Sequence, residues 1–492
     1  MPGGRKRGLG LLTVALLATA CALAPGANAK APPSSLVSFD TTSLFPHYSP
    51  TVRDYVVRCH DAGVAVDGHA SGGWRLAVGS HPFRSGNFTV NVPLGAGRAF
   101  TVTTKADGSA HLYRYYVRCL PDDFPAYTFT HDRPVSPEYF SVDNGSPIVT
   151  SYAVIFDSHG VPVWWYQTPA HATRVLPNGN VLWFNNATRK WEIHRLDGQL
   201  VRILSPVGQT ANDHDVQLMG NGDLLFGAYV PQSHVDTSAF GGSSDATVTN
   251  TELQQVSPGG QLLWDWHSQD HVALAETGHR WPWVVHHPNN GSYDILHWNS
   301  IEPDGNSVIA SFRHLDAVLK IRKSTGNVVW KLGGTHTPQS LTVKKDPRGV
   351  PLGAQHDARL LPDGTLTVFD NRTNLDSNQP RAVRFKIDEK THTATLLEAI
   401  TDPEFPGSNC CGSARRLPNA DWLIDWGQGK PIGGYEPNGH RTFLLTLKAG
   451  ASYRAEPVPP SAVSAKSLRA GMTAMAAAAE PARSPLGRDP GG

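Results

Sequence analysis

Residues 360–370 read LLPDGTLTVFD, a short apolar strand that enters a Pro-Asp-Gly turn and leaves as a second strand. Related phrases recur as VLPNGNVLWF at 175–184, LMGNGDLLFG at 218–227, IEPDGNSVIA at 301–310 and RLPNADWLID at 416–425. A second hairpin commonly follows each copy, and a further strand pair, YAVIFDSHGVPVWWY at 152–166, precedes them all. Short antiparallel sheets that repeat at intervals of roughly 40–60 residues are typical of a β-propeller. The repeats therefore predict an all-β fold, with a six-bladed β-propeller over residues 125–455.

The segments beside this repeat differ from it in composition. Residues 36–124 hold alternating runs such as WRLAV and FTVNV between Gly-rich turns, which predicts a small N-terminal β-sandwich domain. The repeat itself has one long interval, residues 231–293, which we expect to form a functional loop or lid over one face. Residues 456–492 turn rich in Ala, Pro and Ser, a composition typical of a disordered tail.

The N-terminus has the order of a secretory signal peptide. Basic residues at 5–7 precede an apolar stretch over 9–24, and the small residues at 27–29 form a cleavage site. The sequence thus predicts a signal peptide over residues 1–29 and a mature protein that is secreted or held in the cell envelope, periplasmic or extracellular. A less favoured alternative makes Cys21 a lipid-anchored N-terminus. No other segment is long and apolar enough to predict a membrane span.

Charge and cysteine content narrow the class of protein further. The formal net charge is +1 with histidine neutral, so no basic surface for nucleic acid or for a membrane is expected. Cys59 and Cys119 end the similar phrases YVVRC and YYVRC, and we predict that neighbouring strands bring them together as a disulfide. Cys410 and Cys411 are then either a vicinal disulfide or two free thiols.

Three histidines precede the repeated turn by the same distance. His214, His297 and His356 each lie seven residues before the Asn or Asp of their turn. Because the innermost strand of each blade lines the central channel, these imidazoles are expected to converge at one point on the axis. Arg313, which follows the third copy of the motif, is expected to join them.

Imidazoles with a guanidinium suit two kinds of chemistry. Neutral imidazole binds zinc or copper, but Arg313 would repel a cation, so we predict no metal and rank a metalloenzyme second. Asp215 and Asp357 follow two of the histidines and are expected to orient them rather than to bind metal. A tetrahedral anion fits better, since Arg313 and protonated imidazoles can hold its oxygens while a neutral imidazole attacks the central atom. Nearby positive charge would lower the pKa of that imidazole.

Over about 147–450 the sequence resembles the bacterial aryl sulfate sulfotransferases. The resemblance is carried by NDHDVQLMGNGD, ILHWNSIEPDGNSVIASFRH, GAQHDARLLPDGTLTVFDN and CCGSARRLPNADWLIDWG. It implies a six-bladed propeller with a small N-terminal β domain, and transfer of a sulfuryl group between phenols by a ping-pong mechanism. It implies aryl sulfates and phenols as small-molecule partners, with no nucleotide donor and no cofactor. Dimers occur in the family, which leaves a homodimer open for this chain.

The resemblance also implies roles for the candidate residues. His356 matches the nucleophile that becomes a transient sulfohistidine, and His214 matches a histidine that contacts the sulfuryl oxygens. His297 matches the acid and base near the bridging oxygen. Asn299 would hydrogen-bond an oxygen from the same side of the strand, and Arg313 would neutralise charge that develops on the sulfuryl group.

Other readings stay open from the sequence. The tryptophans at 281, 283 and 298 are candidates to contact a phenol, although packing is the more common role of a buried tryptophan. A secreted propeller used for binding or adhesion, with structural histidines in its channel, is the alternative from another class.

Overall fold

The computed structural model describes residues 31–59, 63–133, 135–145, 149–375, 379–429 and 431–479. The predicted signal peptide and Cys21 lie outside these residues. Within them the protein is all-β apart from short helical segments, as predicted. None of the helices in this part of the chain is long and apolar enough to cross a membrane.

The N-terminal region contains two sheets that share one apolar core. One sheet has the order β1 (Val37–Asp40), β3 (Val64–Ala70), β5 (Gly86–Val92). The other has the order β2 (Asp54–Arg58), β7 (Tyr113–Leu120), β6 (Ala99–Ala106), β4 (Trp74–Val78). Alternate residues of β3 are buried, as a strand with one face on a core requires. Cys59 and Cys119 lie at the ends of the parallel neighbours β2 and β7 and form the predicted disulfide.

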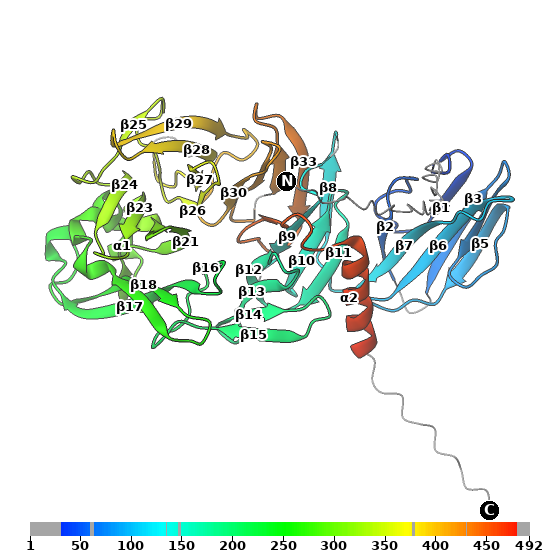
Figure 1. Ribbon diagram of the computed structural model, residues 1–492, viewed down its shortest axis with the longest axis horizontal. Helices are drawn as coiled ribbons and strands as arrows, with labels where there is room; N and C mark the ends of the chain where they lie inside the picture. The colour runs from blue at the N-terminus through cyan, green and yellow to red at the C-terminus, as the bar shows by residue number, and fades with distance from the viewer. Residues whose placement is uncertain are drawn as a thin grey trace, which may run out of the picture.

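Six sheets follow, and Figure 1 shows them arranged around a central region. The first is β9 (Tyr139–Asp143), β10 (Tyr152–Asp157) and β11 (Pro162–Gln167), with β34 (Glu456–Pro457) on β9. The second is β12 (Ala170–Val175), β13 (Val181–Asn185), β14 (Lys190–His194) and β15 (Leu200–Leu204). The third is β16 (Val216–Leu218), β17 (Leu224–Val235), β18 (Ala246–Val256) and β19 (Leu262–His267), with β20 (Ser292–Asp294) beside β18.

The remaining three sheets repeat the pattern. The fourth is β21 (Trp298–Asp304), β22 (Ser307–Phe312), β23 (Ala317–Arg322) and β24 (Val328–Gly333). The fifth is β26 (His356–Leu360), β27 (Thr365–Asp370), β28 (Arg381–Asp388) and β29 (Thr393–Ile400), with β25 (Thr342–Lys344) outside β29. The sixth is β30 (Ser413–Arg416), β31 (Trp422–Asp425), β32 (Ile432–Tyr435) and β33 (Arg441–Leu447), with β8 (Tyr127–His131) on β33.

Each repeated motif of the sequence forms the first hairpin of one sheet. The first strands of neighbouring sheets lie against one another, namely β9 with β12, β16 with β21, β21 with β26 and β26 with β30. They are the innermost strands in Figure 1. Both ends of this region close onto sheets made by the opposite end: β8 completes the sixth sheet, and β34 pairs with β9 of the first.

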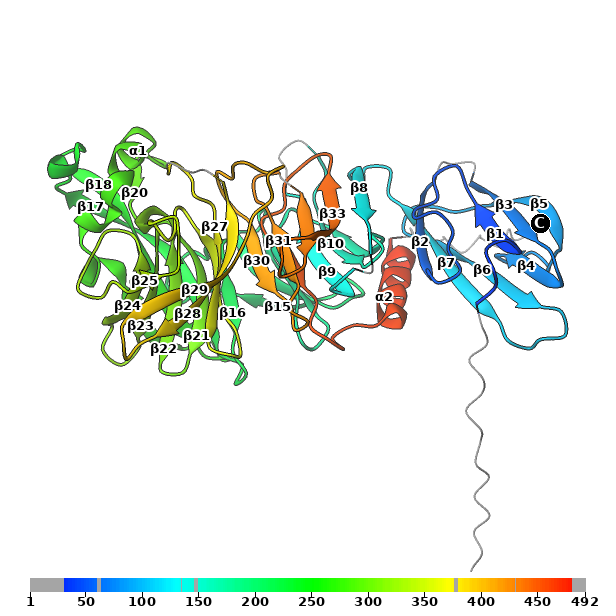
Figure 2. The ribbon, with the colours of Figure 1, turned by 90° about the horizontal axis from the view of Figure 1, so that it is seen from above.

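The long interval between the second and third motifs is largely ordered structure. It extends the β17–β18 hairpin, whose connection contains η1 (Ser238–Phe240). After β19 it forms three short helices: η2 (Ser268–Asp270), η3 (Leu274–Arg280) and α1 (Trp281–His286). Another short turn, η4 (Arg313–Leu315), follows β22. Figure 2 places α1 at one end of the molecule, far from the N-terminal sheets.

The prediction of a disordered tail from residue 456 is wrong for the residues described. Glu456–Pro457 is a strand, and α2 (Ala465–Ala478) is a helix capped by Ser464, whose side chain accepts a hydrogen bond from Ser467 N. Leu468 and Met472 are buried against the first sheet, where Trp165 N donates to Met472 Sδ at 3.3 Å. An Ala-rich segment has high helix propensity, and this apolar face supplies the packing that stabilises it.

The helix α2 connects the two parts of the molecule (Figure 2). Arg469 donates from Nε and Nη2 to Asp54 of β2 at 2.7 and 2.6 Å, and its guanidinium lies 3.7 Å from the centre of the Tyr116 ring. Arg118 of β7 donates to Arg469 O at 3.2 Å. One face of α2 therefore contacts the N-terminal sheets while another contacts β11.

Candidate active site

The histidines of the repeated motif lie at the entries of innermost strands. His356 is the first residue of β26, His297 directly precedes β21, and His214 lies two residues before β16. His171 of β12 has the same spacing, seven residues before Asn178, and it was not among the predicted residues.

Irregular pairing at these strand entries changes the simple alternation of side chains. Register shifts fall between His171 and Arg174, between Trp298 and Ser300, and between His356 and Arg359. A bulge bends the strand and redirects a side chain. The alternation rule alone therefore does not give the direction of His171, His297 and His356, whereas β16 beside His214 pairs with β17 in regular register.

The predicted histidines lie close together, and two of them lie beside the ring of Tyr453. The ring centres of His214 and His297 are 5.0 Å apart. The ring centre of Tyr453 lies 5.6 Å from that of His214 and 6.3 Å from that of His356. Tyr453 also stacks on His171, with ring centres 4.1 Å apart. The sequence prediction that these imidazoles converge agrees with this geometry.

Each of the three imidazoles is held through Nδ1, which leaves Nε2 for a ligand. His356 Nδ1 lies 2.8 Å from Asn371 Oδ1 and 3.1 Å from Ala354 O. Since both atoms are acceptors, Nδ1 carries the proton, and the lone pair of Nε2 accepts a hydrogen bond from Cys411 N at 3.3 Å.

The other two imidazoles have carboxylates at Nδ1. His297 Nδ1 lies 2.5 Å from Asp294 Oδ2, and His214 Nδ1 lies 2.7 Å from Asn212 Oδ1 and 3.1 Å from Asp213 Oδ1. A carboxylate partner stabilises an imidazolium through its charge. The neutral amide of Asn371 also raises the pKa of His356, but burial and Arg313 outweigh it. The sequence prediction missed these orienting residues because they lie outside the repeated phrase.

The surroundings of His356 keep its imidazole neutral. Burial first, and the positive charge of Arg313 second, lower the pKa of His356 well below its usual range. The sequence predicted the effect of charge, and burial makes the larger contribution.

Charges beside His297 act in opposite directions. Burial lowers the pKa of His297, and Asp294 partly opposes this. Burial would by itself raise the pKa of Asp294, but the charge of His297 and its hydrogen bond outweigh burial and lower that pKa. Asp294 is therefore a carboxylate that can stabilise a proton on His297.

Arg313 lies in η4 and is fixed by two hydrogen bonds. Its Nη1 donates to His314 Nε2 at 2.6 Å, and its Nη2 donates to Asn409 O at 2.8 Å. His314 Nδ1 donates in turn to Asp294 O at 2.6 Å, so His314 is a neutral support for the arginine. Burial lowers the pKa of Arg313 to about 10, which keeps it cationic at neutral pH.

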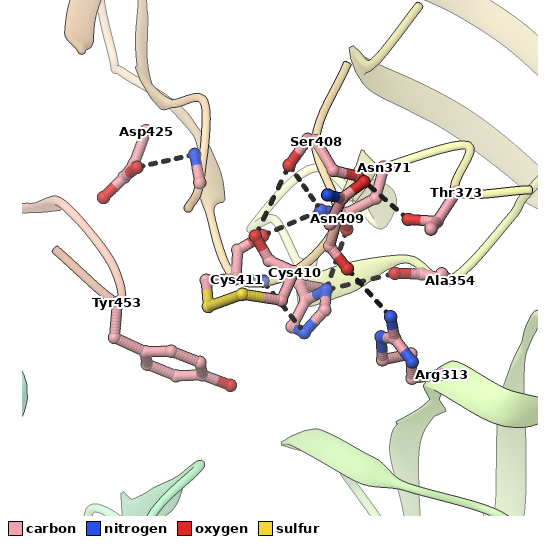
Figure 3. The surroundings of a disulfide bond; sticks show 12 residues. Arg313, Ala354, Asn371, Thr373, Ser408, Asn409, Cys410, Cys411, Asp425 and Tyr453 are labelled. Carbon is pink, nitrogen blue, oxygen red and sulfur yellow. Dashed lines mark hydrogen bonds between the residues drawn. A yellow bond between two sulfur atoms is a disulfide. The ribbon is translucent and has the colours of Figure 1, made fainter. Parts of the chain in front are cut away.

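A loop with a vicinal disulfide lies beside His356 (Figure 3). Cys410 and Cys411 are bonded to each other, which settles the alternative left open above. Cys411 N donates to His356 Nε2 at 3.3 Å. Asn371 Nδ2 donates to Cys411 O at 3.0 Å and to Ser408 Oγ at 2.8 Å. Asn371 therefore connects the imidazole to the loop on its other side.

Three polar atoms of the site have no hydrogen-bond partner among the described residues although they are buried. They are Asn299 Oδ1, Arg313 Nε and Tyr453 Oη. Asn299 Nδ2 donates to Gln355 O at 2.7 Å, so only its oxygen is unpartnered. Unpartnered buried polar atoms are uncommon in native proteins, and their grouping here fits a site that binds a polar ligand.

The prediction that Asp215 and Asp357 orient the histidines is wrong. Both carboxylates pair with Arg359, at 2.8 Å from Asp215 Oδ2 and 2.9 Å from Asp357 Oδ1, and both are near Arg454. The residue after a histidine points away from it along a strand, and here that direction is occupied by buried arginines.

The three candidate tryptophans differ in position. Trp298 is fully buried against Gly227, and Trp281 stacks on Phe240 with ring centres 4.7 Å apart. Trp283 of α1 is 38% exposed, and its ring lies 5.7 Å from the Arg313 guanidinium. Of the three, Trp283 alone lies beside the site with an open face.

One residue group in the site has the ligand types of a metal centre. Atoms of Asp294, His297 and His314 lie within 4.8 Å of one another. Both ring nitrogens of His314 are already hydrogen-bonded, and Arg313 donates to one of them. A cation there would meet a guanidinium, so the electrostatics favour an anion.

Comparison with known protein families gives a match over more than half of the chain. The family model described as Arylsulfotransferase (ASST) matches residues 130–436. No curated protein matches the chain.

Similar solved structures are distant. A protein of unknown function from Bacteroides caccae is 12% identical, with a TM-score of 0.41, over 66% of this chain and 100% of that one. An inactive variant of virginiamycin B lyase from Staphylococcus aureus, with quinupristin, is 11% identical, with a TM-score of 0.33, over 68% and 90%. A regucalcin from Agrobacterium tumefaciens is 13% identical, with a TM-score of 0.35, over 60% and 79%. Likeness at this level carries no functional information.

Proposed function

Because the chain belongs to the arylsulfotransferase (ASST) family, we propose that it transfers a sulfuryl group from an aryl sulfate ester to a phenolic acceptor, without a nucleotide donor. The observation that carries the proposal is the state of His356. Its imidazole is buried and neutral, with Nδ1 donating to Asn371 and Nε2 unprotonated, accepting only a long hydrogen bond from Cys411 N. A neutral imidazole of this kind is a nucleophile.

In the first step His356 Nε2 attacks the sulfur of the donor ester. The bond between sulfur and the phenolic oxygen breaks, its electron pair leaves with the phenolate, and a sulfohistidine forms. The Nδ1 proton stays on the ring, where Asn371 Oδ1 and Ala354 O accept its hydrogen bond. Cys411 N, which faces Nε2 in the free site, is placed to donate to a sulfuryl oxygen.

The sulfuryl oxygens require positive charge as the donor bond breaks. Arg313 supplies it and has Nε unpartnered, while its other nitrogens hold it to His314 and Asn409. Nδ1 of His214 faces Asn212 and Asp213. In this proposal His214 is protonated when the sulfuryl group is bound, and its Nε2–H donates to a second oxygen. Donors fixed in advance stabilise a transition state without reorganisation. Asn299 Oδ1 accepts only, so in this proposal it contacts the hydroxyl of an incoming phenol.

His297 moves the proton. In the second step the acceptor hydroxyl attacks sulfur, the bond to His356 breaks, and the acceptor proton passes to His297 Nε2. Asp294 at Nδ1 stabilises the imidazolium that results. In the next cycle His297 gives this proton to the phenolate that leaves the donor. Over one full cycle the acceptor phenol therefore loses one proton and the donor phenol gains one. Because the donor phenol leaves before the acceptor attacks, the kinetics are ping-pong.

The proposal includes the architecture and the location. We regard the six sheets of residues 127–457 as six blades of a propeller, and the two N-terminal sheets as a sandwich. Residues 1–29 act in this proposal as a signal peptide that directs export. A disulfide between Cys59 and Cys119 is compatible with an oxidising compartment.

Acceptor-dependent turnover tests the function directly. The purified protein is incubated with 4-nitrophenyl sulfate, with and without phenol, and nitrophenol is followed by absorbance. We expect sustained release only with phenol, and a stoichiometric burst without it. Mass spectrometry of the burst state should find one sulfuryl group on the peptide that contains His356.

Two histidine variants test whether His356 is the nucleophile. His356→Ala should abolish both the burst and turnover, while His286→Ala, on the exposed side of α1, should retain them. Absence of release with every phenol pair would reject the transferase and favour a binding module.

A further inference from the structure

Tyr453 lies at the centre of the site but outside the matched family region, which ends at residue 436. Its backbone is fixed on both sides, since Tyr453 N donates to Asp143 Oδ1 at 3.1 Å and Gly412 N donates to Tyr453 O at 2.9 Å. The chain between β33 and β34 thus delivers this side chain to the entries of the inner strands.

The ring of Tyr453 is held by its neighbours. His171 stacks on one face with the planes 29° apart, and the rings of His214 and His356 meet it edge-on at 85° and 80°. The Arg454 guanidinium lies 4.8 Å from the ring centre. A ring with so many contacts has one position, and its hydroxyl therefore has one direction.

That hydroxyl is buried and unpartnered among the described residues, and Tyr453 as a whole is 4% exposed. In Figure 3 it points away from its own backbone toward the side of the site on which Arg313 lies. Burial raises the pKa of Tyr453 well above its usual range, so the group is a neutral hydrogen-bond donor at physiological pH. A donor without an acceptor, aimed into a cationic site, fits an anionic oxygen of a ligand.

His171 supports this arrangement without adding charge. Burial lowers the pKa of His171 to about 4, so it stacks on Tyr453 as a neutral ring. It lies at the same register as the three predicted histidines but contacts Tyr453 more closely than they do. We therefore infer that the His171 ring, at its place in the motif, positions the ring of Tyr453.

We propose that Tyr453 is a further catalytic residue, whose hydroxyl donates a hydrogen bond to a sulfuryl oxygen in both transfer steps, and that His171 is its positioning residue. The inference rests on the proposed sulfuryl transfer. It assigns the hydroxyl to an oxygen that stays with sulfur, whereas His297 serves the oxygen that leaves or attacks.

The test is Tyr453→Phe, which keeps the ring and removes only the hydroxyl. We expect kcat to fall about 100- to 1,000-fold with KM changed much less, the size expected for one transition-state donor. The loss should be the same with 4-nitrophenyl sulfate and with phenyl sulfate, because the hydroxyl does not touch the leaving oxygen. Tyr166→Phe, which packs on Trp183 and His194 away from the site, is the matched control and should keep full activity.

The role of His171 is tested by rescue. His171→Ala should lower kcat nearly as much as Tyr453→Phe, and His171→Phe, which can still stack, should restore most of it. A Tyr453→Phe enzyme within twofold of the wild type would overturn the inference. A loss much larger with phenyl sulfate would overturn the assignment to a sulfuryl oxygen. An inactive wild type would instead reject the proposed function itself.

Discussion

Asn371→Asp should shift the acid limb of the pH–activity profile upward. Asn371 is fully buried, and its Oδ1 accepts from His356 Nδ1 at 2.8 Å. The substitution replaces a neutral acceptor with a carboxylate at the same atom. A carboxylate favours the imidazolium, and a protonated Nε2 has no lone pair with which to attack sulfur.

The size of the shift follows from the geometry. Charges about 4 Å apart at an effective dielectric constant of about 20 attract by about 4 kcal/mol, which corresponds to about 3 pKa units. The new carboxylate is itself buried and desolvated, which reduces the net effect. We expect the pKa of His356 to rise by about 1–2 units. The direction is fixed, because the active form is neutral and is lost as pH falls through that pKa.

The assay is kcat/KM for 4-nitrophenyl sulfate with phenol in excess, measured from acid to alkaline pH. The acid limb of the Asn371→Asp enzyme should lie higher by that interval, with activity recovering at alkaline pH. Asn371→Ala is the control, because it also loses the hydrogen bonds to Cys411 O and Ser408 Oγ but adds no charge. Its activity should fall without an upward shift. An unshifted limb in Asn371→Asp would refute the view that this contact sets the charge of His356.

Three further changes have defined outcomes. Burial raises the pKa of Asp425 to about 7. Between about pH 4 and 7 the folded state therefore holds a proton that the unfolded state has lost. As the pH rises through this range, the contribution of Asp425 should lower the unfolding free energy by about 1.4 kcal/mol per pH unit. Urea denaturation should show that slope flattened in Asp425→Asn, and an unchanged slope would exclude this residue as its source. Replacing Cys410 and Cys411 together with serine removes the disulfide, so the loop no longer holds the backbone N–H of residue 411 in a fixed position against His356 Nε2. It should lower kcat about tenfold and make it insensitive to dithiothreitol, unlike the wild type, whereas full activity would show that the bond does not position the loop. Arg469→Ala removes the ion pair with Asp54 and should cost about 1 kcal/mol. Limited proteolysis should then cleave α2 faster while sulfuryl transfer is retained, and equal cleavage rates would contradict the role of α2 as a connector.

The repeated phrase predicts much of the site because it shows where each histidine lies relative to the turn, as well as which residues form strands. A fixed distance of seven residues from the turn indicated His214, His297 and His356. The same distance separates His171 from Asn178, so the signal for the fourth imidazole is present in the sequence. Equal spacing places residues at equivalent points of each sheet, and ring-like packing brings those points together.

The partners of these histidines could not be read in the same way. Asp294 and Asn371 lie before and after strands in segments that differ from one repeat to the next. Their contacts depend on loop conformation and on bulges, which hydrophobic periodicity does not report. Tyr453 comes from a connection with no repeated signal at all, and only tertiary packing places it near His356.

The helix α2 illustrates the opposite failure. The Ala-, Pro- and Ser-rich composition predicts disorder, although Ser464 and Ser467 form a recognisable helix start. Composition does not show that Leu468 and Met472 meet an apolar surface on a distant strand. Whether this segment forms a helix depends on the apolar surface that other parts of the chain provide for it.

The exchange of strands between the two ends of the ring has a consequence for biosynthesis. β8 (Tyr127–His131) is translated early, but its partner β33 (Arg441–Leu447) is among the last strands to leave the ribosome. A nascent chain must therefore carry an unpaired edge strand through nearly the whole of synthesis, and such edges invite pairing with other chains. Closure is a terminal event, so a messenger truncated before codon 441 would give a product without β33 and β34, in which β8 and β9 lose these partners and the seam stays open.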